Sequence, residues 1–199
     1  MLRSIRQGIT IFFVLAIIVG VGYPALITGL SQLVFPWQSN GSLLHYHGKI
    51  VGSAEIGQYF TKSEYFWGRP SATDPVPYDA ANSGASNLGP SNPALFHHIA
   101  KRVAYLREMD PAEGHRPVPV DLVTSSFSGL DPDISIAAAQ YQVARVAHAG
   151  HLPIATVKQL MHANTRWPLI PFIGEPVVNV LRLNLALHAL YTRQKNALH

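Results

Sequence analysis

A hydroxyl-rich run at residues 124–128 is the first place where the side chains of this sequence could do chemistry, because Asp131 and Asp133 follow it closely. Together with one of the ten histidines, a serine of this run could form a Ser-His-Asp nucleophile. The run lacks the Gly-x-Ser-x-Gly turn that exposes such a serine between a strand and a helix. Serine and aspartate also satisfy free backbone N–H groups where helices begin. The spacing therefore favours a turn leading into a helix, and we expect no catalytic residue.

Three pairs of histidines raise the question of a metal site: His45 with His47, His97 with His98, and His148 with His151. The first pair would share one face of a strand, and the last pair one face of a helix. A metal would also need a carboxylate or a third histidine nearby, and the sequence places none beside these pairs, while cysteine is absent altogether. We therefore expect solvent-facing histidines and no metal ligand. A metal-binding module stays open as a function class.

Nucleotide chemistry lacks its usual signatures in this chain. There is no Gly-x4-Gly-Lys-Ser/Thr loop, no Gly-x-Gly-x-x-Gly after a strand and no aspartyl-phosphate signature. The formal net charge is +4, but two of the basic residues stand at the N-terminus and no basic run or basic–aromatic stripe follows. A nucleic-acid partner is therefore not indicated.

The N-terminal segment is the element that must hold the chain in place. Residues 9–35 contain no Asp, Glu, Lys, Arg or His. A bilayer core about 30 Å thick needs about 20 apolar helical residues, so the segment can span it with some tilt. The alternative is a cleaved signal peptide, but its apolar core has only about 7–15 residues and ends at a small-x-small site. We expect an uncleaved transmembrane helix at residues 9–35.

The charges beside this segment predict its orientation. Arg3 and Arg6 precede it, and positive residues that flank a first membrane helix stay in the cytoplasm. Residues 1–8 should then be cytoplasmic, with Trp37 as an interfacial aromatic anchor on the other side. Residues 36–199, ending at His199, are enough for one extracytoplasmic domain with its own core.

Small residues gather on one side of the predicted span. Gly22, Ala25 and Gly29 fall within about 60° of one another at 100° per residue. Small residues on one face allow another membrane helix to approach closely. Glycine is also simply frequent in membrane helices, so packing against a partner helix and plain composition are both open.

The predicted outer domain has two parts that differ in amino-acid composition. Residues 36–92 are rich in Gly, Pro, Ser and Asn, with short strands such as residues 49–56, yet they hold too many aromatics for a disordered tether. An ordered, irregular region is predicted here. We expect Arg69, Asn87 and Asn92 to fix it by satisfying backbone groups, either within the domain or against a partner.

Residues 93–199 should be mainly helical, which gives an α+β fold with helix predominant. In the first helix, Leu95, Ile99, Val103 and Leu106 should face the core, while the polar residues face away: His97, His98, Lys101, Arg102, Arg107 and Glu108. The last helix is apolar almost all round and should lie at the centre of the domain. The predicted limits are a helix from Pro93, capped by Asn92, to Pro111 and Gly114; a strand at residues 118–124; a helix capped by Ser135 and ending at Gly150; a helix from Pro153 to Pro168 and Pro171; and a helix at residues 177–191.

Several blocks of this sequence resemble the C subunit of the bacterial Kdp-type potassium-transporting P-type ATPase. They run in family order over nearly the whole chain. They are Gly22-Tyr23-Pro24, residues 35–42, 68–72, 83–93, 118–124, 128–131, 174–180 and 183–187. Two small departures are Ala85, where a second glycine is usual, and Ile136, where proline is common.

The resemblance implies a non-catalytic accessory subunit of an ATP-driven potassium uptake complex in the inner (plasma) membrane. The implied partners are a channel-like subunit that selects potassium and a P-type subunit that hydrolyses ATP. The resemblance also implies a role in assembly and a catalytic-chaperone role that raises the ATP affinity of the catalytic subunit. Potassium is then the transported ion and ATP belongs to the complex.

The predicted topology bears on the nucleotide. An outer domain faces away from cytoplasmic ATP, so we expect any effect on ATP binding to pass through the complex. No cofactor is expected on this chain itself, although the resemblance also implies an assignment as an ATP-binding, nucleotide-binding protein. An anchored extracytoplasmic hydrolase is the alternative function.

Overall fold

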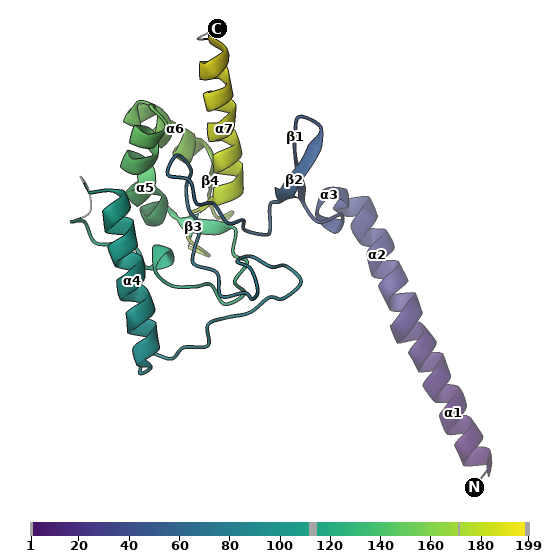
Figure 1. Cartoon of the computed structure of the whole chain (residues 1–199). Coiled ribbons are helices and arrows are strands. Elements are labelled where there is room, and N and C mark those ends of the chain that lie inside the picture. Colours follow the sequence, from purple (N-terminus) through teal and green to yellow (C-terminus); the bar gives the residue numbers. More distant parts are fainter. Residues whose placement is uncertain (1, 112–114, 171, 198–199) are drawn as a thin grey trace. The chain divides into compact units, whose positions relative to one another are not determined.

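The computed structural model describes residues 2–111, 115–170 and 172–197 (Figure 1). Three residues named in the predictions, Gly114, Pro171 and His199, lie outside this described part. The chain divides into two compact units, Met1–Leu43 and Leu44–His199, and each is described on its own.

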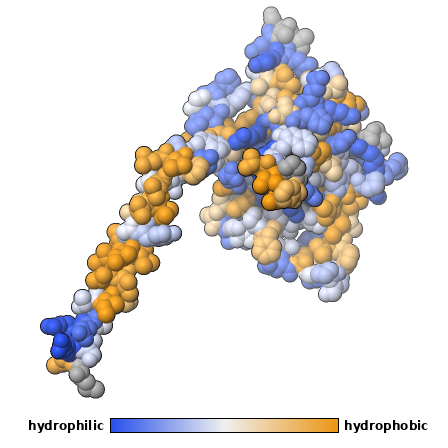
Figure 2. Space-filling view, turned by 180° about the vertical axis from the view of Figure 1, so that it is seen from behind, coloured by the Kyte–Doolittle hydropathy of each residue, from blue (hydrophilic) through white to orange (hydrophobic). Residues whose placement is uncertain are grey.

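The first unit is dominated by one long helix. It consists of α1 (Leu2–Ile17), a π-helical turn (Ile18–Gly22) and α2 (Tyr23–Val34), and the short α3 (Pro36–Ser39) follows. The 33 residues Leu2–Val34 are long and apolar enough to cross a membrane, and Figure 2 shows their apolar surface with a hydrophilic end at the N-terminus. At 1.5 Å per residue the helix is about 50 Å long, more than a bilayer core of about 30 Å requires. It fits a single membrane span, and the helix itself begins at Leu2, before the predicted span.

The π turn explains how Pro24 lies in this helix without ending it. Proline has no N–H, and its ring crowds the carbonyl group four residues earlier. Directly before Pro24, the N–H of Tyr23 donates to the carbonyl oxygen of Ile18, five residues back. Such a wide turn relieves the crowding, but it also means that 100° per residue does not hold across residues 18–22.

The second unit combines four longer helices with very short strands. The helices are α4 (Pro93–Met109), α5 (Ile136–Ala149), α6 (Ile154–Ala163) and α7 (Val180–Ala197), and α6 packs against both α5 and α7 (Figure 1). A three-stranded antiparallel sheet has the order β3 (Asp133–Ser135), β5 (Val177–Asn179), β4 (Thr165–Arg166). β1 (Leu43–Tyr46) and β2 (Lys49–Ser53) form a hairpin. The predicted α+β fold with helix predominant is confirmed.

The core of this unit lies between the helices and the sheet. Its largest fully buried side chains include Phe66, Leu122, Ile134, Met161, Leu183 and Leu187. α5 supplies most of the buried helical residues, and the first two turns of α7 add Val180, Leu181, Leu183 and Leu187. Arg182 and His188 on the same helix are exposed, and Leu185 and Leu190 are only half-buried, so α7 is buried on one side and not all round as its composition predicted.

The predicted helix limits agree with the structure at three caps. Oδ1 of Asn92 accepts the N–H of Ala94, and Oγ of Ser135 accepts the N–H of Ala138. Gly150 ends α5 as predicted. These local signals work because each satisfies backbone groups that a helix end leaves free.

Two predicted elements are wrong, and a third is too long: the helix expected from Pro153 to Pro168 ends at Ala163, because Thr165 and Arg166 pair as β4 with β5. Residues 118–124 form no strand but a 3₁₀ turn at Val120–Leu122, closed when the N–H and hydroxyl of Thr124 both donate to the Val120 carbonyl. The last helix begins at Val180 instead of Val177, because residues 177–179 pair with β3 and β4. Oδ1 of Asn179 then accepts the N–H of Arg182 at the start of α7. Strand pairing with distant residues therefore overrides the local helical pattern.

Candidate functional site

A buried dipeptide, Phe66 and Trp67, fixes the irregular chain to the helices. The N–H of Phe66 donates to Oδ1 of Asn184 (2.8 Å), and Nδ2 of Asn184 donates back to the Phe66 carbonyl (2.9 Å). The N–H of Trp67 likewise donates to Oε1 of Gln142 (2.8 Å), and Nε2 of Gln142 donates back to the Trp67 carbonyl (3.0 Å). Asn184 on α7 and Gln142 on α5 thus replace the backbone pairing that a strand would have provided. No local sequence signal marks these two amides.

Arg145 completes this attachment. Its guanidinium donates to the carbonyl oxygens of Ser63 and Tyr65 and to Oε1 of Gln142, and it lies 3.7 Å from the centre of the Trp67 ring. Burial lowers the pKa of Arg145 to about 10, because no solvent stabilises the charge. Carbonyl dipoles and an aromatic face therefore hold a buried cation in place.

The predicted residue Arg69 lies where two irregular segments meet. Its Nη1 is 3.3 Å from Oδ2 of Asp131, and its Nη2 donates to the carbonyl oxygen of Ser125 at 3.3 Å. Asn87 is exposed and has a φ of 52°, a left-handed conformation that asparagine adopts more easily than most residues. Asn92 caps α4. Their part in fixing the region or contacting a partner stays a prediction.

Tyr78 and Ser71, which the sequence did not single out, also hold this region together. The Tyr78 hydroxyl donates to the Arg69 carbonyl at 2.6 Å, and Oγ of Ser71 accepts the N–H of Tyr78 at 2.9 Å and donates to the Gly129 carbonyl at 2.7 Å. Gly129 has a φ of +70°, and a Cβ there would lie 2.7 Å from the Gly84 carbonyl oxygen. Burial, followed by the charge of Asp131, raises the pKa of Tyr78 to about 12. The irregular chain is therefore closely packed.

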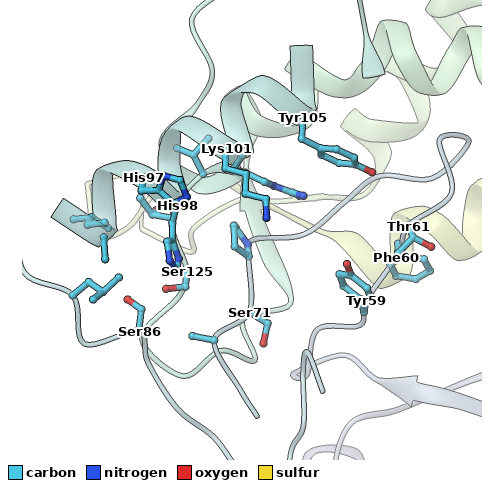
Figure 3. A pocket seen from close by; sticks show the side chains of 18 residues that line it. Tyr59, Phe60, Thr61, Ser71, Ser86, His97, His98, Lys101, Tyr105 and Ser125 are labelled. Atoms are coloured by element: carbon cyan, nitrogen blue, oxygen red, sulfur yellow. The ribbon is translucent and has the colours of Figure 1, made fainter. Parts of the chain in front are cut away.

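These contacts shape a groove of about 860 Å³ along α4, which we call the α4 groove (Figure 3). One wall is the face of α4 that carries His97, His98, Lys101, Arg102 and Tyr105. The other walls come from residues 59–61, 70–72 and 123–125, with Ser86 and Leu88. Because Phe66 and Trp67 lie between residues 59–61 and 70–72, the amides of Asn184 and Gln142 hold two walls of the groove in position.

The charged side chains among the described residues of the α4 groove all have the same sign. Among the described residues that line it there are four basic or imidazole side chains and no Asp or Glu. None of the ion pairs between described residues involves His97, His98, Lys101 or Arg102. The groove walls thus present positive charge beside aromatic rings and hydroxyl groups.

Arg102 departs from its predicted position. It was expected to face solvent, but it is half-buried, donates from Nε to the Leu122 carbonyl (3.1 Å) and lies 5.4 Å from the centre of the Tyr105 ring. Burial lowers its pKa. A planar guanidinium stacks on aromatic rings more easily than an ammonium, which explains why an apolar–polar pattern misplaced it.

Side chains of the hydroxyl-rich run make hydrogen bonds to the backbone in the described structure. Ser126 is buried, and Oγ of Ser128 accepts the N–H of Leu130 at 3.1 Å. Ser125 and His98 both line the α4 groove (Figure 3). Asp131, which a Ser-His-Asp arrangement would need beyond a histidine, instead lies against Arg69. This arrangement does not support the hypothesis of a hydrolase.

The histidine pairs do not share the predicted faces. β1 ends at Tyr46, and His47 follows with a φ of 48°, while His151 lies in a turn after α5 with a φ of 52°. Among the described residues, no three or more His, Asp or Glu side chains lie together in a way that could hold a metal ion.

The predicted membrane residues lie on the long helix of the first unit. Gly22 is the last residue of the π turn, and Ala25 and Gly29 follow on α2. A Cβ at Gly29 would meet nothing within 4 Å, so this side is open to another helix. Arg3 and Arg6 lie in the first turns of α1, and Trp37 on α3 donates from Nε1 to the Leu43 carbonyl.

Comparison with known proteins gives a consistent result. Residues 5–189 match the model of the KdpC family, described as the c chain of the K⁺-transporting ATPase. The chain is 55% identical to the potassium-transporting ATPase KdpC subunit of Ralstonia nicotianae over 183 residues, covering 92% of this chain and 89% of the relative. The subunit of the same name from Polaromonas naphthalenivorans is 53% identical over 190 residues (96% of each chain). That from Photorhabdus laumondii is 53% identical over 186 residues (94% and 96%).

Proposed function

Because this chain belongs to the KdpC family, the c chain of the K⁺-transporting ATPase, we propose that it is a non-catalytic accessory subunit of an ATP-driven potassium uptake complex. The observation that carries the proposal is the family match, which covers the membrane helix and nearly all of the second unit. Each of the three relatives is named as a potassium-transporting ATPase subunit, and this chain matches almost the full length of each.

The partners in this proposal are a channel-like subunit that selects potassium and a P-type subunit that hydrolyses ATP. Potassium is the transported ion, ATP is bound in the complex, and this chain contributes to assembly. The long apolar helix supports membership in a membrane complex, because all of its described side chains from Leu2 to Leu30 are exposed. Within a bilayer such a helix contacts either lipid or other helices, and Gly22, Ala25 and Gly29 favour close helix packing.

The orientation in this proposal places the N-terminus in the cytoplasm and the second unit outside the inner membrane, because Arg3 and Arg6 precede the span. A periplasm-active reporter fused to the C-terminus should be active, and a cytoplasm-active reporter at the same position should be inactive. The opposite pattern would reverse the topology. It would also remove the argument that this chain influences ATP affinity only through its partners.

Copurification tests the proposed function directly. The full-length chain, tagged and isolated from native membranes in mild detergent, should bring down two larger membrane proteins. Deleting its gene should abolish growth that depends on potassium uptake by this complex. A chain that purifies alone from wild-type membranes, with uptake unaffected by its deletion, would contradict the proposal.

A further inference from the structure

The α4 groove carries positive charge that the described part of the chain does not neutralise. Lys101 is exposed and takes part in no ion pair between described residues, and the charged group of Arg102 contacts only a carbonyl oxygen and aromatic rings. Keeping a half-buried guanidinium without a carboxylate costs free energy, which its lowered pKa reflects. A ligand that brings negative charge into the groove would relieve this cost.

The shape of the groove narrows the class of ligand. The four cationic or imidazole side chains occupy residues 97–102, a distance of about 7–8 Å along the helix at 1.5 Å per residue. Tyr59, Phe60 and Leu95 supply apolar lining, and Ser71 and Ser86 supply hydroxyls that can bond a peptide backbone (Figure 3). The groove therefore suits an extended ligand in which acidic and apolar groups alternate.

A compact phosphate is a poorer fit to the same geometry. Phosphate sites commonly gather several N–H donors of a helix N-terminus around one anion. At α4 the Asn92 side chain already accepts the N–H of Ala94, and Pro93 has no N–H. The cations come instead from the second and third turns of the helix. Spread charges of this kind match several carboxylates along a chain better than one phosphate.

We propose that the α4 groove binds an acidic segment of polypeptide from the ion-selecting subunit of the complex. The inference rests on the proposed function for the existence of that partner. Rings of Asp and Glu side chains are one device by which channels select cations, and an acidic segment of this kind on the partner would match the positive charge of the groove. Opposite potentials on two surfaces speed their encounter and fix their register.

Site-specific photo-crosslinking in the intact complex tests this inference. A photoreactive phenylalanine derivative replaces Tyr59, which is 64% exposed and lines the groove. The matched control places the same group at Phe127, an aromatic that is 93% exposed and does not line the groove. Peptide mapping should identify an acidic segment of the ion-selecting subunit from position 59 and not from position 127.

A charge reversal then tests the electrostatic part. Lys101→Glu should lower the crosslink yield at position 59 about tenfold at low salt, whereas Lys158→Glu, an exposed lysine on α6, should leave it unchanged. Crosslinks to lipid, to no protein, or equally from positions 59 and 127 overturn the inference, as does equal yield in the two lysine variants. In each of these cases normal copurification of the partners would leave the proposed function standing. Loss of copurification in the wild-type chain would overturn both.

Discussion

Gln142→Ala should weaken the attachment of the irregular chain to the helices more than any surface truncation. The Gln142 side chain is 1% exposed, and both hydrogen bonds to the backbone of Trp67, at 2.8 and 3.0 Å, come from its amide. Without it, a buried N–H and a buried C=O lose their partner, at about 1–3 kcal/mol each. The guanidinium of Arg145 also loses an acceptor at 2.7 Å. A loss of about 2–6 kcal/mol is expected, a large part of a typical domain stability of about 5–15 kcal/mol.

Urea unfolding of the detergent-solubilised full-length chain measures this loss, with tryptophan fluorescence as the signal. Gln140→Ala is the matched control, because Gln140 is exposed on the same helix and its truncation should change the free energy of unfolding by at most about 0.5 kcal/mol. The slope with urea should stay constant in both variants. If Gln142→Ala and Gln140→Ala agree within about 0.5 kcal/mol, the Trp67 attachment does not hold the irregular chain in place.

Four further predictions concern other parts of the chain. Arg69→Ala should lower complex yield or domain stability, the latter by about 1 kcal/mol because its ion pair is partly exposed; unchanged yield and urea midpoint would show a mere surface charge. Ser125→Ala should leave potassium uptake intact, and complete loss of uptake with normal assembly would revive the catalytic reading. Gly29→Leu should insert normally but copurify poorly with its partners, whereas Ser31→Leu, on a different side of α2, should copurify better; equal recovery refutes helix packing at this face. The Tyr78 contribution to stability is fully present below pH 10, the pKa of a free tyrosine, and is lost as pH rises through the folded-state pKa of about 12, so urea unfolding of Tyr78→Phe should show a shallower decline across this window; a parallel decline would contradict it.

Local signals in the sequence were sufficient for the membrane helix and for several helix ends. The absence of charge over residues 9–35 predicted the span, and Asn92 and Ser135 predicted two caps, because each depends only on neighbouring residues. The family blocks extended this to the identity of the chain. The helix starts earlier than the uncharged run, since a helix continues past the bilayer wherever nothing ends it.

Long-range pairing accounts for what the sequence could not predict. Gln142 and Asn184 contact residues 75 and 118 positions away, and no spacing rule links an amide on a helix to one particular backbone group. The strand at Val177–Asn179 likewise exists only because β3 and β4 lie beside it. Arg102 was placed outside by its charge, although stacking on Tyr105 brings it inward. The α4 groove depends on the amide contacts of Gln142 and Asn184 and on the inward position of Arg102, so no local motif could predict it.

ATP hydrolysis tests the central claim most directly. The rate is measured for the purified full-length chain alone, for the complete complex, and for the complex prepared without this chain, each with and without potassium. We predict no hydrolysis by the chain alone and potassium-stimulated hydrolysis only by the complete complex. Hydrolysis by the isolated chain, or an unchanged rate in the complex that lacks it, would contradict a non-catalytic accessory subunit.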